Sequence, residues 1–257
     1  MRSWLLSFAI LAAALDAARG DFGSIAAVAN QCRPGDVSLS KDRTILCFDG
    51  EIRDQDPKIF HELKQDGFFV MRSPGGFADS SMMLADILHE KNATVIVYDY
   101  CLSSCANYFL IAASRTYVRR DTIVAWHGGI PRYDCSRVDL DEMRRRYRHQ
   151  FNLDEDAAAK RVDQFCNEAG LAEAFFKRRG IDDRHTYAPQ TVYTQKMVRM
   201  ATSQRPAKQS VFWMWHPKNQ GDYFKSRVIY ESYPMSQEHV EEILRRLRLS
   251  MHVYYDP

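Results

Sequence analysis

The sequence of 257 residues predicts an α/β domain with a mostly parallel sheet. Between residues 44 and 130, short apolar runs rich in β-branched and aromatic residues alternate with amphipathic helical patterns. This alternation is typical of right-handed β-α-β crossovers, which give a parallel sheet covered on both faces by helices. With 46% hydrophobic and 26% charged residues, the composition is that of a globular protein with a packed core.

The elements expected in this first half follow one another regularly. The strands are expected at 44–48, 68–71, 93–98 and 122–126, and the helices at 56–65, 82–88 and 105–113. The first helix begins with Asp56 as a candidate N-cap and Pro57 at the first helical position, where a missing N–H costs nothing.

The second half of the chain has a different pattern. Residues 140–166 are expected to form one long amphipathic helix, whose Arg144–Arg146 run is interpreted as a solvated face. A strand is expected at 210–215, and a final helix after Ser236. We expect one mature domain over 21–257, with a core at about 44–130, a helical excursion at about 136–180 and a C-terminal strand and helix at 210–257.

Residues 1–20 have the pattern of a secretory signal peptide. Arg2 is followed by an apolar stretch, Trp4 to Leu15, and then by small residues up to Gly20. This stretch is short for crossing a bilayer of about 30 Å, so an uncleaved anchor is the weaker alternative. The protein is therefore expected to be exported, periplasmic or secreted. The net charge of +2 gives no support for nucleic-acid binding.

Six cysteines form an even set that can pair in an oxidising compartment. The expected pairs are Cys32 with Cys47 and Cys135 with Cys166, and the alternative is that the cysteines stay free as small buried apolar residues. No metal site is expected, because Cys101-x3-Cys105 has no second Cys or His pair at zinc spacing.

Three strand ends carry the residues that could do chemistry. They are Gly75-Gly76, Ser103-Ser104 and His127, and ligands of open α/β sheets bind at such ends. A serine that begins a helix can act as a nucleophile if a histidine accepts its proton. Each feature alone has an ordinary structural interpretation: a tight turn, a helix cap or a structural histidine.

The motifs at these three places resemble the Clp protease proteolytic subunit, in the Clp/crotonase superfamily. They are Ser73-Pro-Gly-Gly76, Cys101-Leu-Ser-Ser-Cys-Ala-Asn-Tyr-Phe-Leu110 and Ala125-Trp-His-Gly128, and the exported bacterial branch is the most similar. The resemblance covers about residues 44–130. It implies a Clp/crotonase-like β-β-α superhelix with a long helical insertion, and a serine peptidase activity.

The resemblance also implies roles for residues. Gly75 and Gly76 match the oxyanion turn, Cys105 the adjacent backbone donor and His127 the base. Counting without gaps from the strand Val95 to Tyr98 places the nucleophile at Ser104, which is the favoured assignment. The Cys-x-Ser-x-Cys pattern of the exported relatives places it at Ser103 instead.

The acid of the family's triad is missing at its usual position. Ser203 to Ser210, before the strand at Val211, contains no carboxylate. Asp182, Asp183 or Asp222 are the alternatives, although Asp182-Asp183 also has the pattern of a solvated turn. A Ser/His dyad would need none of them, since the acid orients the histidine and does not react.

Three functions remain open at this point. The first is an exported serine hydrolase, peptidase-like, that acts on peptides or unfolded polypeptides without a cofactor. The second is a catalytically inactive relative that binds peptides in the same cleft, which the missing acid favours. The third, an acyl-CoA enzyme, is disfavoured by export. Self-association into a homo-oligomer is compatible with the resemblance, and neither an ATPase partner nor nucleic acid is expected.

Overall fold

The protein is an α/β structure built on a mostly parallel mixed sheet. The computed structural model describes residues 22–35, 37–54, 56–127, 129, 134–186, 211–218, 224 and 227–255. The strands are β1 (Val37–Leu39), β2 (Ile45–Asp49), β3 (Phe68–Ser73), β4 (Thr94–Leu102), β5 (Thr116–Val118), β6 (Ile123–Ala125), β7 (Val211–Met214), β8 (Val228–Tyr230) and β9 (His252–Tyr255). The helices are 22–29, α2 (Lys58–Glu62), α3 (Ala78–Glu90), α4 (Ser104–Tyr108), α5 (Leu140–Phe151), α6 (Glu155–Arg179) and α9 (Gln237–Arg246), with 3-10 turns η1 (Phe109–Ile111) and η2 (Cys135–Arg137).

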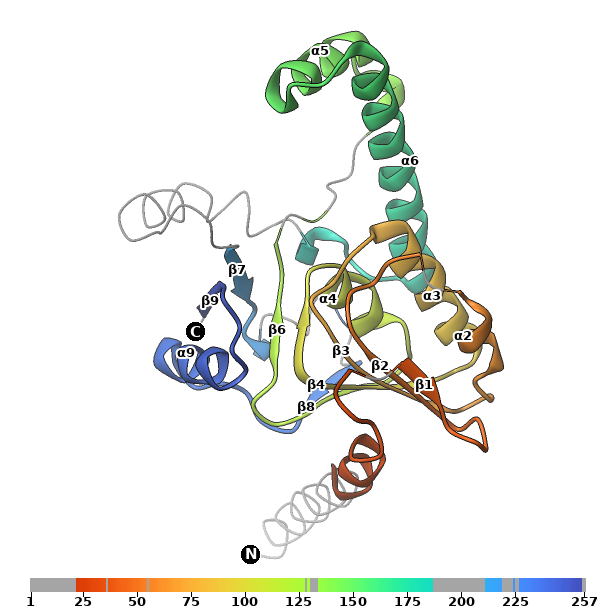
Figure 1. Cartoon of the computed structure of the whole chain (residues 1–257), viewed down its shortest axis with the longest axis vertical. Coiled ribbons are helices and arrows are strands. Elements are labelled where there is room, and N and C mark those ends of the chain that lie inside the picture. The colour runs from red at the N-terminus through yellow and green to blue at the C-terminus, as the bar shows by residue number, and fades with distance from the viewer. Residues whose placement is uncertain are drawn as a thin grey trace, which may run out of the picture.

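The strand order of the main sheet is β1-β2-β3-β4-β5-β8. The β1 strand is antiparallel to β2, and the other pairs in this order are parallel. Helices α2, α3, α4 and α6 lie on one side of this sheet and helix 22–29 on the other (Figure 1). The expected α/β class with a mostly parallel sheet is confirmed.

The central strands are buried on both faces, which explains their nearly continuous apolar sequence. Along β2, Leu46 and Phe48 face the core under α3 and α4, while Ile45 and Cys47 face helix 22–29. A side-chain period of two produces this alternation. The apolar runs of the sequence therefore predict strands with two covered faces.

Strand β4 pairs with different neighbours along its length. Its first half, around Ile96, pairs with β5, and its second half, around Cys101, pairs with β6. Asp99 lies between the halves with φ of 56°, and the register against β3 shifts at the same level. Beyond this bend a second apolar cluster joins β6 to β7, β9 and α9. The end of β4 thus stays in the sheet, paired with β3 and β6, and runs directly into Ser103.

The long helix expected at 140–166 is two helices. Helix α5 ends at Asn152, which takes the left-handed conformation with φ of 51°, and Asp154 caps α6 by accepting a hydrogen bond from the Ala157 N–H. An Asn in the left-handed region and an Asp N-cap together stop one helix and start another. Helix α5 and the N-terminal part of α6 project from the body, whereas the C-terminal part of α6 packs on the core through Phe175 and Phe176 (Figure 1). Arg145 and Arg146 are exposed on α5 and pair with Glu142, as expected of a solvated face.

Three disulfides link the six cysteines. Both expected pairs are bonded, Cys32–Cys47 and Cys135–Cys166, and the third bond joins Cys101 to Cys105. A full set of disulfides is typical of proteins from an oxidising, extracytoplasmic compartment. In the part of the chain that the structure describes, no helix is both long and apolar enough for a membrane span. The expected signal peptide, residues 1–20, lies outside the described residues.

Candidate active site

The turn between β4 and α4 has an unusual backbone. Ser103 has φ of 55° and ψ of −123°, between the last residue of β4 and the first of α4. Positive φ disfavours residues that carry a Cβ, and a non-glycine residue held there is strained. A sharp, strained strand-to-helix turn is also how a nucleophilic serine is presented at the edge of a sheet. The Ser103 side chain is half-buried.

The neighbouring serine has a different environment. Ser104 is only 6% exposed, and its hydroxyl donates a hydrogen bond of 2.8 Å to the Gly76 carbonyl oxygen. This bond ties the start of α4 to the Gly75-Gly76 turn. Ser104, the nucleophile favoured from the sequence, is therefore buried and its hydroxyl is engaged in a structural hydrogen bond, whereas Ser103 is half-buried.

The Gly75-Gly76 turn is packed directly against the serine turn. Gly75 has φ of +95°, and a Cβ there would lie 2.6 Å from the Leu102 carbonyl oxygen and 2.7 Å from the Ser103 Cβ. Gly76 has φ of +153°, and its Cβ would lie 1.8 Å from the Ile52 carbonyl oxygen. Only glycine fits at either place, so the pair brings backbone to within contact of Ser103.

Backbone N–H groups at this place are suited to an oxyanion. Gly76 forms a parallel bridge with Ile52, in which Ile52 donates to the Gly75 carbonyl and Phe77 donates to the Ile52 carbonyl, each at 2.8 Å. Gly76's own N–H and C=O point to the other side, where its C=O accepts from Ser104. Among the described residues the Gly76 N–H has no acceptor, so it is a candidate oxyanion donor.

The predicted second donor, Cys105, lies in the first turn of α4. The first N–H groups of a helix have no partner within the helix, so its amide is of the required kind. Its side chain is bonded to Cys101, with the two Cα atoms 5.3 Å apart. Leu102, Ser103 and Ser104 thus lie inside a small covalent ring, which sequence reasoning missed although both cysteines were in view.

His127 follows β6, the strand that pairs with the end of β4. The register matches Leu102 with Ala125, and the Ser103 N–H donates to the Ala125 carbonyl at 3.0 Å. His127 is therefore two residues along the neighbouring strand from a residue bonded to Ser103. Its ring packs on Phe212 with centroids 4.4 Å apart. No hydrogen bond between His127 and either serine is found among the described residues.

The surroundings of His127 favour the neutral form of its imidazole. The residue is exposed, but the surrounding protein partly desolvates the ring and lowers its pKa below the usual 6.5. Burial is the cause, and no described carboxylate counteracts it. A neutral imidazole at pH 7 can accept a proton.

Among the described residues, no contact joins His127 to a candidate acid. Asp182 is hydrogen-bonded to Arg184 at 2.7 Å, and Asp183 is buried, 3% exposed. Both adjoin His185, a fully buried histidine whose Nδ1 lies 2.6 Å from the Asp182 carbonyl oxygen. Asp222, like residues 203–210 where the family acid was sought, lies outside the described residues.

The segment around His185 approaches the chain after His127. The Gly129 N–H donates to the Thr186 carbonyl at 3.1 Å. Burial among aromatic rings lowers the pKa of His185 to about 4. Sequence reasoning did not single out His185, because nothing in a single sequence separates a buried histidine from a solvated one.

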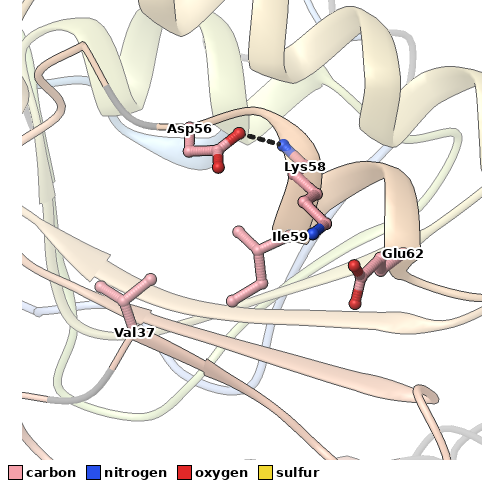
Figure 2. A pocket seen from close by; sticks show the side chains of 5 residues that line it. All are labelled: Val37, Asp56, Lys58, Ile59 and Glu62. Atoms are coloured by element: carbon pink, nitrogen blue, oxygen red, sulfur yellow. Dashed lines mark hydrogen bonds between the residues drawn. The ribbon is translucent and has the colours of Figure 1, made fainter.

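Other candidate sites are less informative. No group of three His, Cys, Asp or Glu side chains that could hold a metal ion occurs within the described ranges. Figure 2 shows a surface pocket at the edge of the sheet, lined by Val37 of β1 and by Asp56, Lys58, Ile59 and Glu62 at α2. It contains none of the predicted site residues, and its polar groups do not include a nucleophile with a base.

Comparison with protein-family models gives no match for this chain, and no curated protein sequence matches it significantly.

Proposed function

We propose that this protein is a serine hydrolase of an oxidising compartment, peptidase-like, with Ser103 as nucleophile and His127 as base. The single observation that carries the proposal is the Ser103 turn, a strained strand-to-helix turn packed against two glycines. Strain of this kind persists where surrounding structure imposes it, and it is concentrated at functional sites. The three disulfides support the oxidising location.

The choice of Ser103 over Ser104 follows from their hydrogen bonds and exposure. The Ser104 hydroxyl is used in the bond to the Gly76 carbonyl and is shielded from a substrate. Ser103 is the more exposed of the two. The exported Clp-like proteins that this chain resembles have a Cys-x-Ser-x-Cys pattern. The serine of this chain that matches it is Ser103.

The proposed reaction forms and then hydrolyses an acyl-enzyme. The Ser103 hydroxyl oxygen attacks the substrate carbonyl carbon while the His127 imidazole takes the hydroxyl proton. The negative charge that develops on the carbonyl oxygen is stabilised by the N–H groups of Gly76 and Cys105. The protonated imidazole gives its proton to the leaving group, and water repeats the sequence to release the acid and restore Ser103.

The substrate class comes from the resemblance to the Clp protease proteolytic subunit. Peptides or unfolded polypeptides are the proposed substrates, and a Clp/crotonase-like superhelix is the proposed fold. The parallel order of β2, β3 and β4, with α3 and α4 on one face, is compatible with it.

Labelling by a fluorophosphonate probe tests the proposal. The unmodified protein should be labelled, Ser103→Ala should abolish labelling, and Ser104→Ala, the matched control one residue away, should keep more than about a tenth of the rate. Failure of the unmodified, folded protein to react would remove the hydrolase proposal.

A second function is favoured by one observation. The pKa of His127 shows no influence of a described carboxylate, so the orienting acid is not seen. A protein with this site but without a group that orients His127 for catalysis would bind peptides without cleaving them. Binding of an unfolded polypeptide such as reduced casein, unchanged by Ser103→Ala and without cleavage, would support that function.

A further inference from the structure

The Cys101–Cys105 disulfide closes the smallest covalent ring in the described part of the chain, with a sequence separation of 4. Four residues of extended chain would span about 13 Å, whereas the two Cα atoms are 5.3 Å apart. The bond can form only when the chain reverses between the two cysteines. The residue at which it reverses is Ser103, the proposed nucleophile.

The Ser103 conformation needs such a constraint. A serine with φ of 55° and ψ of −123° lies outside the left-handed helical region and is strained, and it stays so only when neighbouring structure imposes the conformation. Other interactions also hold the turn. The Ser103 N–H donates to the Ala125 carbonyl, the Asn107 N–H donates to the Ser103 carbonyl, and the Ser104 hydroxyl donates to the Gly76 carbonyl. The Cys105 sulfur also contacts the Met71 sulfur at 3.7 Å. These are non-covalent, and each can break when the turn relaxes.

Both cysteines of the ring are completely buried. One belongs to β4 and the other to α4, so the bond joins the strand that leads into the turn to the helix that leaves it. We propose that the Cys101–Cys105 disulfide is the positioning element that holds Ser103 in its reactive conformation, so that the hydrolase becomes competent only after this pair is oxidised. This inference rests on the proposed function.

The redox step is an ordinary thiol oxidation. The two thiols lose two electrons and two protons and form one S–S bond. Glutathione disulfide, or the disulfide of an oxidoreductase, accepts the two electrons and two protons and is reduced to two thiols. Before export, in a reducing cytoplasm, the pair stays reduced and the turn is free to relax.

A positioning role makes a different prediction from general stabilisation. In the chain-entropy account, the stabilisation by a disulfide grows with the length of the loop it closes. The Cys32–Cys47 bond, with a sequence separation of 15, should therefore contribute more to stability than Cys101–Cys105. For activity the order should be reversed.

The test compares Cys101→Ala/Cys105→Ala with Cys32→Ala/Cys47→Ala as the matched control. Fluorophosphonate kinetics give the maximal inactivation rate and the apparent probe affinity separately. The first variant should lose about 100-fold in maximal rate, as expected when a reacting atom is misplaced by about 1 Å, with its affinity within about twofold. Its melting temperature should fall less than that of the control. A maximal rate within about threefold of the unmodified protein would overturn the inference.

A second measurement needs no variant and serves if the double variant does not fold. The unmodified protein is refolded in glutathione buffers of graded thiol-to-disulfide ratio, and each bond is counted by alkylation and mass spectrometry. The labelling rate should follow the fraction of Cys101–Cys105 bond. If it follows either of the other two bonds, the inference is wrong while the proposed function survives. A fully oxidised protein that is never labelled would refute both.

Discussion

The two halves of the candidate site are built differently. The serine half is fixed by a disulfide, by two glycines against which a Cβ would clash, and by the Ser104 hydroxyl bond to Gly76. The histidine half consists of the exposed His127, whose imidazole packs on Phe212 and has no hydrogen bond to an orienting group among the described residues.

The two halves correspond to two different requirements of acyl transfer. The nucleophile and the oxyanion donors must be placed before the substrate arrives, because their contribution depends on preorganisation. A base needs the right protonation state and reach, and hydrogen bonds to it often tighten only in the complex with substrate. Under the proposed function, the fixed serine half corresponds to the first requirement, and the lowered pKa of His127 corresponds to the protonation part of the second.

The largest expected effect comes from removing the base. His127→Ala should slow fluorophosphonate labelling by about 10² to 10⁴-fold, the usual contribution of a general base, while the unfolding midpoint in urea stays close to that of the unmodified protein. In the unmodified protein the rate should fall at acid pH, with a midpoint below 6.5, because the base is lost as His127 is protonated. An acid midpoint above 6.5 would point to a carboxylate partner.

The glycine turn gives the next effect. Gly75→Ala would place a Cβ 2.6 Å from the Leu102 carbonyl oxygen, so it should destabilise the fold by about 1–3 kcal/mol and strongly reduce labelling. The control is Gly170→Ala in α6, where nothing lies within 4 Å of the added Cβ. Stabilisation there by up to about 1 kcal/mol is expected from helix propensity. Equal effects of the two changes would contradict the close packing of the serine half.

Buried His185 predicts a dependence of stability on pH. Its folded pKa of about 4 is below the usual 6.5, so only the unfolded chain binds the proton between these values and stability falls with falling pH. Between pH 7 and pH 5 the loss from this group is about 2 kcal/mol. Urea unfolding at both values measures it. His185→Phe should remove most of this difference, and an unchanged difference would show that other groups cause it.

The smallest effect is expected at a candidate acid. Asp182→Asn should change the labelling rate by less than about twofold, because the Asp182 carboxylate is bonded to Arg184 and no described carboxylate shifts the pKa of His127. A loss of tenfold or more, without loss of folding, would make Asp182 a third member of the site.

The fold was predictable where local pattern decides it. The two-faced apolar strands and the helices between them follow from periodicity. The pairs Cys32–Cys47 and Cys135–Cys166 were chosen from 15 possible connectivities and are confirmed. The strands β1, β5, β8 and β9 were not expected, because three or four residues are too few to show the alternation that predicts a strand. The break at Asn152 was missed because apolar periodicity continues through both helices, whereas a left-handed residue ends the first.

The candidate site was predictable in its parts but not in its geometry. Gly75, Gly76, the two serines and His127 were all found from their places at strand ends. The distinction between Ser103 and Ser104 depends on one backbone dihedral and one hydrogen bond, and neither is encoded by residue type. The Cys101–Cys105 bond requires the same chain reversal, and the sequence analysis considered these two cysteines only as a possible metal motif.

The most direct test of the account is to locate the covalent adduct. The fully oxidised, fluorophosphonate-labelled protein is reduced, alkylated and digested, and tandem mass spectrometry of the peptide with Ser103 and Ser104 assigns the modified oxygen. We expect the phosphonyl group on Ser103. A group on Ser104 would contradict the assignment drawn from the Ser104 bond to Gly76, and an adduct on neither serine would contradict the serine hydrolase itself.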